Sequence, residues 1–257
     1  MSTDRHVLSS SIGKKLIMSL TGLFLSTFLV VHLIGNLQLF YSDGGKAFNE
    51  YALTMTTFTP IKVVSYLLYA SIIIHAVYAL VLTIQNKKAR PVGYAVVNGS
   101  ANSKWNSRNM GLLGTIILVF LATHLQNFWW KYHNDQVPYV EYRTDLSTME
   151  TEVREMQASE FSAPVSYVEN GVEITQVRDL YKQVDFAFQN WFLVLFYVIS
   201  MVALSYHLIH GFTSAFQTLG FNHKRYYPFV KFLGVWVFGV AIPLGFAAMP
   251  LYFFLLK

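Results

Sequence analysis

The chain contains no cysteine and carries few charged residues for its length. Without cysteine, disulfides, thiolate metal sites and covalent attachment of a c-type haem are all excluded. Only 13% of the 257 residues are charged, whereas about 25% is typical of a soluble domain. Hydrophobic residues make up 54% of the chain, so the composition favours a membrane protein.

The hydrophobic residues are gathered in five long blocks, and about 20 apolar residues suffice for a helix to cross a bilayer. The blocks cover residues 16–40, 61–84, 111–130, 186–216 and 229–256. We therefore expect an all-α membrane protein, with residues 1–257 forming a single domain built as a bundle of five transmembrane helices. In such a bundle each helix satisfies its own backbone polar groups.

Basic residues are distributed unevenly between the two sides of this bundle. With the N-terminus inside the cell, eleven of the 19 basic residues and only Asp4 of the 14 acidic ones lie on the inner side. Basic residues in short loops mark the cytoplasmic side of a membrane protein. We expect a cytoplasmic N-terminus and a C-terminus outside, so the high pI reflects topology. No groove-reading motif indicates nucleic acid.

The segment between the third and fourth blocks, residues 131–185, is an acidic outer loop of unusual length. Apolar residues recur in it at helical spacing, which predicts a short helix. These residues are Leu146, Met149, Val153 and Met156. Asn170 and Gly171 stand between β-prone residues, which predicts a hairpin. We interpret the segment as a small cap over the outer face.

Histidines stand out among the polar residues of the spans. The chain has eight, and five lie within the predicted spans: His32, His75, His124, His207 and His210. The other three, His6, His133 and His223, lie in polar segments where we expect them to be solvated. One intramembrane histidine can simply hydrogen-bond to a neighbouring helix. Ionisable groups on four different helices are harder to explain this way, because they are costly in lipid and usually functional.

The depths of four histidines along their helices suggest two pairs. At about 1.5 Å per residue, His32 and His124 lie roughly 7 and 5 Å to the outer side of their span midpoints. His75 and His207 lie roughly 4 and 9 Å to the cytoplasmic side. The alternating directions of the helices therefore place His32 level with His124, and His75 level with His207.

Two facing imidazoles in an apolar bundle suit few chemical roles. Zinc normally takes four ligands, and these spans offer no thiolate or nearby carboxylate. A proton relay more typically includes Asp or Glu. A b-type haem needs two axial imidazoles and an apolar slot, which facing helices can build. The pattern thus predicts two haems, one for each pair of histidines.

Small and polar residues accompany the four histidines. Glycines that would let a flat ring approach the backbone are Gly22, Gly35, Gly111, Gly114 and Gly211. Polar residues within about one turn of a candidate ligand, able to orient an imidazole, are Asn36, Ser71, Tyr78 and Ser205. Small residues also promote ordinary helix packing, so the glycines carry little weight alone.

Four motifs resemble those of a known family. They are "TGLFLSTFLVVHLIGNL" around His32, "SIIIHAVYAL" around His75, "SRNMGLLGTIILVFLATHL" leading to His124, and "SYHLIHGFTSAFQTLG" with His207. Across all five spans, though not in the outer loop, the chain resembles the single-chain, di-haem b558 type of cytochrome b subunit of succinate dehydrogenases and fumarate reductases.

The resemblance has a specific spacing in the fourth motif. In the family, a ligand histidine is followed by glycines four and thirteen residues later. Here His207, Gly211 and Gly220 have that spacing, which selects His207 over His210 as the axial ligand. The family pairing, first with third histidine-bearing helix and second with fourth, agrees with the pairing from depth.

The resemblance implies partners, cofactors and a location. Such a subunit, in the bacterial inner (cytoplasmic) membrane, anchors a flavoprotein and an iron–sulfur subunit on the cytoplasmic side. Succinate chemistry occurs in the flavoprotein, so this chain would carry no catalytic residue for it. Electrons would pass through two b haems to a quinone. Such complexes can also form homo-oligomers. Glu50 is the candidate quinone-site acid, and Arg108 and Lys15 are candidate partners of haem propionates.

One departure from the family pattern bears on the direction of the reaction. Some fumarate-reducing members carry a glutamate two residues before the fourth ligand, where this chain has Ser205. Its absence favours succinate oxidation with menaquinone as the acceptor. The alternatives are a menaquinol:fumarate reductase subunit, a b-type subunit of another respiratory dehydrogenase, and a non-haem transporter.

Overall fold

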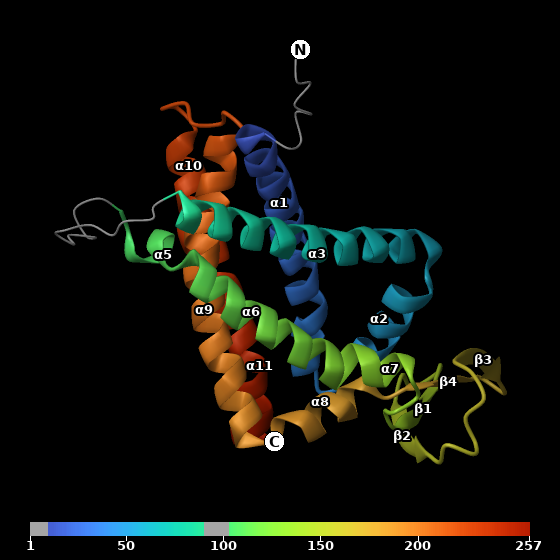
Figure 1. Cartoon of the computed structure of the whole chain (residues 1–257). Helices are drawn as coiled ribbons and strands as arrows, with labels where there is room; N and C mark the ends of the chain where they lie inside the picture. Colours follow the sequence, from blue (N-terminus) through green and yellow to red (C-terminus); the bar gives the residue numbers. More distant parts are fainter. Residues whose placement is uncertain (1–9, 90–102) are drawn as a thin grey trace, which may run out of the picture. The chain divides into compact units, whose positions relative to one another are not determined.

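The computed structural model describes residues 10–89 and 103–257 (Figure 1). The residues Asp4, Arg5, His6 and Arg90, which entered the charge and histidine arguments, lie outside that part. Within it, five helices are long and apolar enough to cross a membrane. They cover Ser11–Phe40, Thr59–Lys88, Met110–His133, Trp191–Thr218 and Tyr227–Leu256. The predicted number of candidate spans is confirmed; their orientation stays a prediction.

Several candidate spans change helix type along their length. The first joins α1 (Ser11–Asn36) to the 3₁₀ helix η2 (Leu37–Phe40), and the second is α3 (Thr59–Lys88). The third follows the short α5 (Trp105–Arg108) and joins α6 (Met110–His124), the π-helix η3 (Leu125–Trp130) and α7 (Lys131–His133). The fourth is α9 (Trp191–Thr218). The fifth joins α10 (Tyr227–Phe232), the π-helix η4 (Leu233–Ala241) and α11 (Ile242–Leu256).

The chain divides into two compact units, and every candidate span contributes to both. The first unit comprises Met1–Val31, Ser65–Phe120 and Val198–Ala247. The second comprises His32–Val64, Leu121–Tyr197 and Ala248–Lys257. Each predicted histidine pair falls within one unit: His75 with His207 in the first, and His32 with His124 in the second.

The second unit contains an antiparallel sheet, so the expectation of an all-α chain is wrong for the loop segment. Its strands are β1 (Tyr139–Asp145), β2 (Thr151–Met156), β3 (Val165–Glu169) and β4 (Val172–Arg178), in the order β2-β1-β4-β3. The predicted hairpin is confirmed: Asn170 and Gly171, with φ of 51° and 80°, connect β3 to β4. Two consecutive positive φ values match the twist of a tight hairpin.

The predicted short helix in the loop is wrong. Met149 lies in the turn between β1 and β2 with a φ of 60°, and Val153 lies in β2. All of β2 is exposed except Met156, so the spacing of its apolar residues does not follow a buried helix face. Pairing along the whole of β1 outweighs the local pattern.

A separate helix, α2 (Lys46–Thr57), packs on this sheet ahead of the second span. Leu53 packs against the buried cluster of Val140, Tyr142 and Val177. A buried polar network adds to this apolar contact. Asn49, fully buried, donates to the Tyr142 hydroxyl at 2.9 Å and to Asp179 Oδ1 at 2.8 Å. Its own Oδ1 accepts the backbone N–H of Tyr181, which lies in α8 (Leu180–Phe188).

Candidate functional site

Two pairs of histidines are brought together, one in each unit. The ring centroids of His32 and His124 lie 5.8 Å apart with an interplanar angle of 89°. Those of His75 and His207 lie 6.2 Å apart at 65°. These are the two pairs that the depth argument predicts. Each side chain keeps partial exposure, so the protein itself does not fill all the space around the rings.

The His75–His207 separation of 6.2 Å is that expected of two imidazoles on opposite sides of one metal ion, and the His32–His124 separation of 5.8 Å is slightly shorter. A metal–imidazole bond is about 2.0–2.1 Å long and the ring centroid lies about 1.1 Å beyond the nitrogen, so opposed rings have centroids about 6.2–6.4 Å apart. Ordinary contacts between aromatic rings also cover about 4.5–7 Å, so the distance alone does not distinguish a metal centre from ring packing. Each of these rings is an imidazole, whose nitrogen can bind a metal ion.

The number of protein ligands at each pair, two, limits which kind of metal centre the pair could hold. Among residues 10–89 and 103–257, no three His, Cys, Asp or Glu side chains form a group able to hold a metal ion. A centre with two protein ligands suits a metal that brings further ligands of its own. Iron in a porphyrin does so, because four ring nitrogens leave only two axial positions for the protein.

Thr21 fixes the ring of His75. Its Oγ1 lies 3.1 Å from His75 Nδ1 and donates its own hydrogen to the Ile17 carbonyl at 2.8 Å. The hydroxyl oxygen therefore accepts a hydrogen bond from Nδ1–H. The imidazole also interacts with the backbone of Met18. With the proton on Nδ1, Nε2 keeps the free lone pair that a metal requires.

The other three histidines have different surroundings. Asn36 Nδ2 donates to the His32 carbonyl at 2.7 Å and lies 3.4 Å from His32 Nδ1. His124 is surrounded by aromatic rings, with Phe128 at 5.3 Å and the buried Tyr197 at 6.2 Å between centroids. Nδ1 of His207 is buried and has no hydrogen-bond partner among the described residues. An unsatisfied buried nitrogen costs about 1–3 kcal/mol, so its retention calls for an explanation.

Glycines lie close to the rings of His75 and His207, the pair in the first unit. A Cβ at Gly22 would lie 3.3 Å from Cε1 of His75, which is a tight contact. A Cβ at Gly114 would lie 3.9 Å from Cε1 of His207. Gly211, one turn after His207, is only half-buried, and a Cβ there would meet no described atom within 4 Å. That space beside the ligand candidate can accept a flat ring.

The π-helix η3 begins directly after His124. A π segment adds a residue to the helical turn and rotates the residues beyond it, and such segments are frequent at functional sites. Here it turns Phe128 towards both His124 and Phe188, whose ring centroids lie 5.3 and 5.9 Å away. Nothing in the sequence of this segment distinguishes a π turn from an α turn.

Glu50 lies in α2, outside the candidate spans, rather than at the start of the second span. Its side chain is 42% exposed and pairs with Lys46 at 3.7 Å. Burial raises the pKa of Glu50, and Lys46 opposes that shift in part. The neighbouring Tyr51 packs its ring against Gly35, three residues after His32. Helix α2 thus places this acid near the helix that carries His32.

The two predicted propionate partners are exposed residues of the first unit. Arg108 ends α5, and its guanidinium donates to the Ser103 carbonyl. Lys15 is in the second turn of α1, and its carbonyl accepts the Ser19 hydroxyl. Their role as propionate partners stays a prediction.

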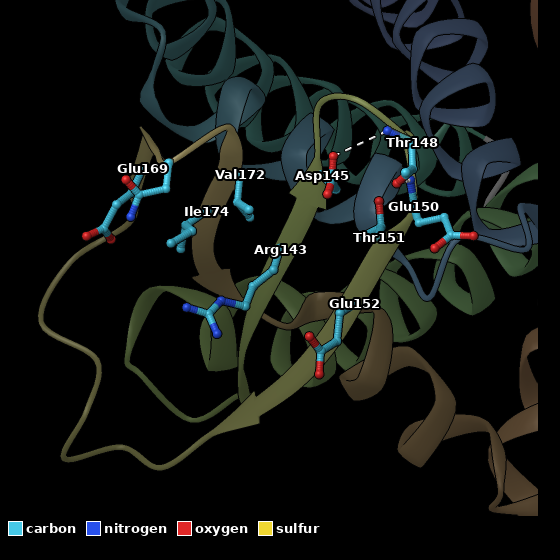
Figure 2. Close-up of a pocket in the computed structure, with 10 residues that line it drawn as sticks. Arg143, Asp145, Thr148, Glu150, Thr151, Glu152, Glu169, Val172 and Ile174 are labelled. Atoms are coloured by element: carbon cyan, nitrogen blue, oxygen red, sulfur yellow. Dashed lines mark hydrogen bonds between the residues drawn. The ribbon is translucent and has the colours of Figure 1, made fainter.

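Two hollows are lined by none of the four paired histidines. The larger, about 600 Å³, is an open hollow over the sheet, lined mostly by polar residues of β1, β2 and the hairpin (Figure 2). Asp145 on its rim accepts the Ser147 hydroxyl at 2.6 Å and the N–H groups of Ser147 and Thr148 at 2.7 and 3.3 Å, and these hydrogen bonds lower the pKa of this carboxyl. That acid therefore serves the β1–β2 turn. The second hollow, about 430 Å³, lies in the first unit.

Comparison of the chain with protein-family models, with curated proteins and with solved structures finds no match.

Proposed function

We propose that this chain is the membrane-anchor cytochrome b subunit of a succinate:quinone oxidoreductase. It would pass electrons from a cytoplasmic iron–sulfur subunit through two b haems to a quinone, with menaquinone as the acceptor. The observation that carries the proposal is the pairing of His32 with His124 and of His75 with His207 at 5.8 and 6.2 Å between ring centroids. The motifs around the four histidines add the family resemblance.

The residues present fit two haems, each held by one histidine pair. A haem with two axial histidines supplies one-electron transfer without binding oxygen. The buried, unsatisfied Nδ1 of His207 and the open space beside Gly211 suit a further group in the first unit. In the second unit, Tyr197, Phe128 and Phe188 form an apolar wall around His124. These side chains would exclude water from the metal ligands.

The chain's own residues set how the ligands bind. The hydrogen bond from His75 Nδ1 to Thr21 orients the ring and makes Nε2 a stronger donor. Asn36 restrains His32 through its contacts with the ring and with the backbone of the same residue. Exclusion of water from the imidazoles would reduce the solvent reorganisation that accompanies a change in the charge of the bound iron.

Glu50 is the proposed proton-exchanging group of a quinone site. Quinone reduction consumes protons, so the site needs a group that can gain and lose one at moderate pH. Burial raises the Glu50 pKa towards that range. Glu50→Gln should lower quinone turnover and leave haem absorbance unchanged. Glu152→Gln is the matched control, because Glu152 is an exposed acid of the same unit that forms no ion pair with Lys46 in the described structure. Normal turnover in Glu50→Gln would remove this role.

The partners and the location belong to the same proposal. The chain would lie in the inner membrane of a bacterium, N-terminus in the cytoplasm, with flavoprotein and iron–sulfur subunits bound on that side. Ser205, which replaces a proton-carrying glutamate of some fumarate reducers, donates its hydroxyl to the Gly239 carbonyl. A hydroxyl engaged in this way supports succinate oxidation over fumarate reduction. The fumarate reductase subunit and the b subunit of another dehydrogenase remain the alternatives.

A reduced-minus-oxidised visible spectrum of the purified complex tests the proposal. We expect a b-type α band with two components. His75→Ala and His207→Ala should each remove one and the same component, and His32→Ala and His124→Ala the other. His133→Ala, in an exposed histidine outside both pairs, should remove neither. Absence of any b-type band would refute the haem assignment and favour a transporter.

A further inference from the structure

The second hollow, in the first unit, is lined by nine residues with polar side chains and by the apolar Ile209 and Val235. Its polar lining residues are Lys104, Asn106, Ser107, His210, Thr213, Ser214, Gln217, Tyr227 and Lys231. No acidic residue lines it, and neither lysine forms an ion pair within the described ranges 10–89 and 103–257. An unpaired cationic lining with hydroxyl and amide donors is chemically complementary to an oxyanion.

The two lysines come from different elements that converge on one place. Lys104 precedes α5, and it lies close enough to His210 in α9 for an electrostatic interaction. Lys231 is in the last turn of α10, with its Nζ 5.1 Å from the ring centroid of Tyr227. Ser214 Oγ lies 3.3 Å from His210 Nε2, and Gln217 hydrogen-bonds to Tyr227. The lining is therefore organised by contacts among its own members.

Aromatic residues place this hollow at the level of the membrane–water interface. Trp105 and Tyr226 stand directly beside lining residues, and both are more than 40% exposed. The Trp105 ring contacts Tyr206 at 5.6 Å between centroids. Tryptophan and tyrosine concentrate at the headgroup level of membranes. The hollow also lies where α9 ends and α10 begins, at the ends of two candidate spans.

We propose that this hollow binds the phosphate group of an anionic phospholipid. Its volume of about 430 Å³ accommodates a headgroup phosphate. Basic hollows between membrane helices bind such headgroups, and a lysine near the surface strengthens the binding of an anionic lipid. The two lysines supply the charge, and the hydroxyl and amide groups supply directed hydrogen bonds to the phosphate oxygens. None of the four paired histidines lines this hollow.

The test is retention of phospholipid by the purified complex in a neutral detergent, titrated with phosphatidylglycerol or phosphatidylcholine and read by native mass spectrometry. We expect a preference for phosphatidylglycerol. Lys104→Gln and Lys231→Gln should each weaken its binding about fivefold, from about 1 kcal/mol per lysine. Both lysines are exposed, so the variants should fold. Lys224→Gln, an exposed lysine outside the hollow, is the matched control and should change nothing.

Three outcomes would overturn the proposal. Equal loss of binding in Lys224→Gln would mean a general charge effect without a site. Displacement of the lipid by an equal concentration of inorganic phosphate would assign the hollow to free phosphate. Unchanged lipid retention together with a shifted haem spectrum in Lys104→Gln or Lys231→Gln would assign the lysines to the carboxylates of a porphyrin. Lipid retention can be measured whether or not the chain carries haem, so the two proposals fail separately.

Discussion

Replacing Thr21 by valine tests how the chain tunes one centre and not the other. The substitution keeps the shape and the β-branch of the side chain and removes only the hydroxyl. It abolishes the 3.1 Å hydrogen bond that His75 Nδ1 donates to Thr21. That bond makes the imidazole a stronger donor, which favours the ferric state of a bound haem. Its loss should therefore raise the midpoint potential.

The size of the shift depends on the strength of the bond. A neutral hydrogen bond contributes about 1 kcal/mol net, and a tenfold change in a one-electron equilibrium is about 59 mV. If between a quarter and all of that energy differs between the two oxidation states, the potential rises by about 10–40 mV. A potentiometric titration monitored by visible absorbance resolves a shift of this size.

The test has a matched control, and it identifies which of the two spectral components shifts. Thr27→Val removes a hydroxyl from the same helix, one that donates to the Leu23 carbonyl and contacts no histidine ring in the described structure. It should leave both potentials unchanged. In Thr21→Val, only the component that disappears in His75→Ala should move. A shift in the other component, a downward shift, or an equal shift in Thr27→Val would show that Thr21 does not tune His75.

Three further predictions concern stability. Gly35→Ala places a Cβ 2.3 Å from the Tyr51 ring, so it should cost about 1–3 kcal/mol in thermal unfolding, whereas Gly111→Ala meets only 3.8 Å contacts and should cost little. Asn49→Ala removes three buried hydrogen bonds and should speed amide exchange in β1 and β4 at least tenfold; unchanged exchange would contradict the network's role. Burial raises the pKa of Asp179, so its carboxyl favours folding in acid, and stability should fall as the pH rises above the ordinary carboxyl range near about 4. Asp179→Asn should flatten that dependence, measured by exchange corrected for intrinsic rates; a persistent slope would assign it to another group.

The spans and the histidine pairs could be predicted from the sequence because each depends on a simple regularity. Long apolar runs reveal the helices, and a fixed rise per residue converts sequence position into depth. Asn170-Gly171 predicts the hairpin because both residues tolerate a positive φ. These signals are local, or they depend on helix geometry alone.

Other features depend on contacts between distant segments, which the local pattern does not carry. Residues 151–156 form a strand because they pair with β1, which also pairs with β4, although their apolar residues have helical spacing. Thr21 lies 54 residues from His75 and more than one turn from every candidate ligand, so sequence spacing does not identify it. The π turn after His124 occurs in a segment, LQNFWW, that has no Gly or Pro to mark it. Long-range packing selects all three.

The number and ligation of haems in the purified complex decide whether the histidine pairs bind iron porphyrins. Haem content by the pyridine haemochrome method, with near-infrared magnetic circular dichroism of the oxidised state, measures both. We expect two haems per chain, each with two axial imidazoles. No haem, one haem per chain, or an axial ligand other than histidine at either centre would contradict the proposal.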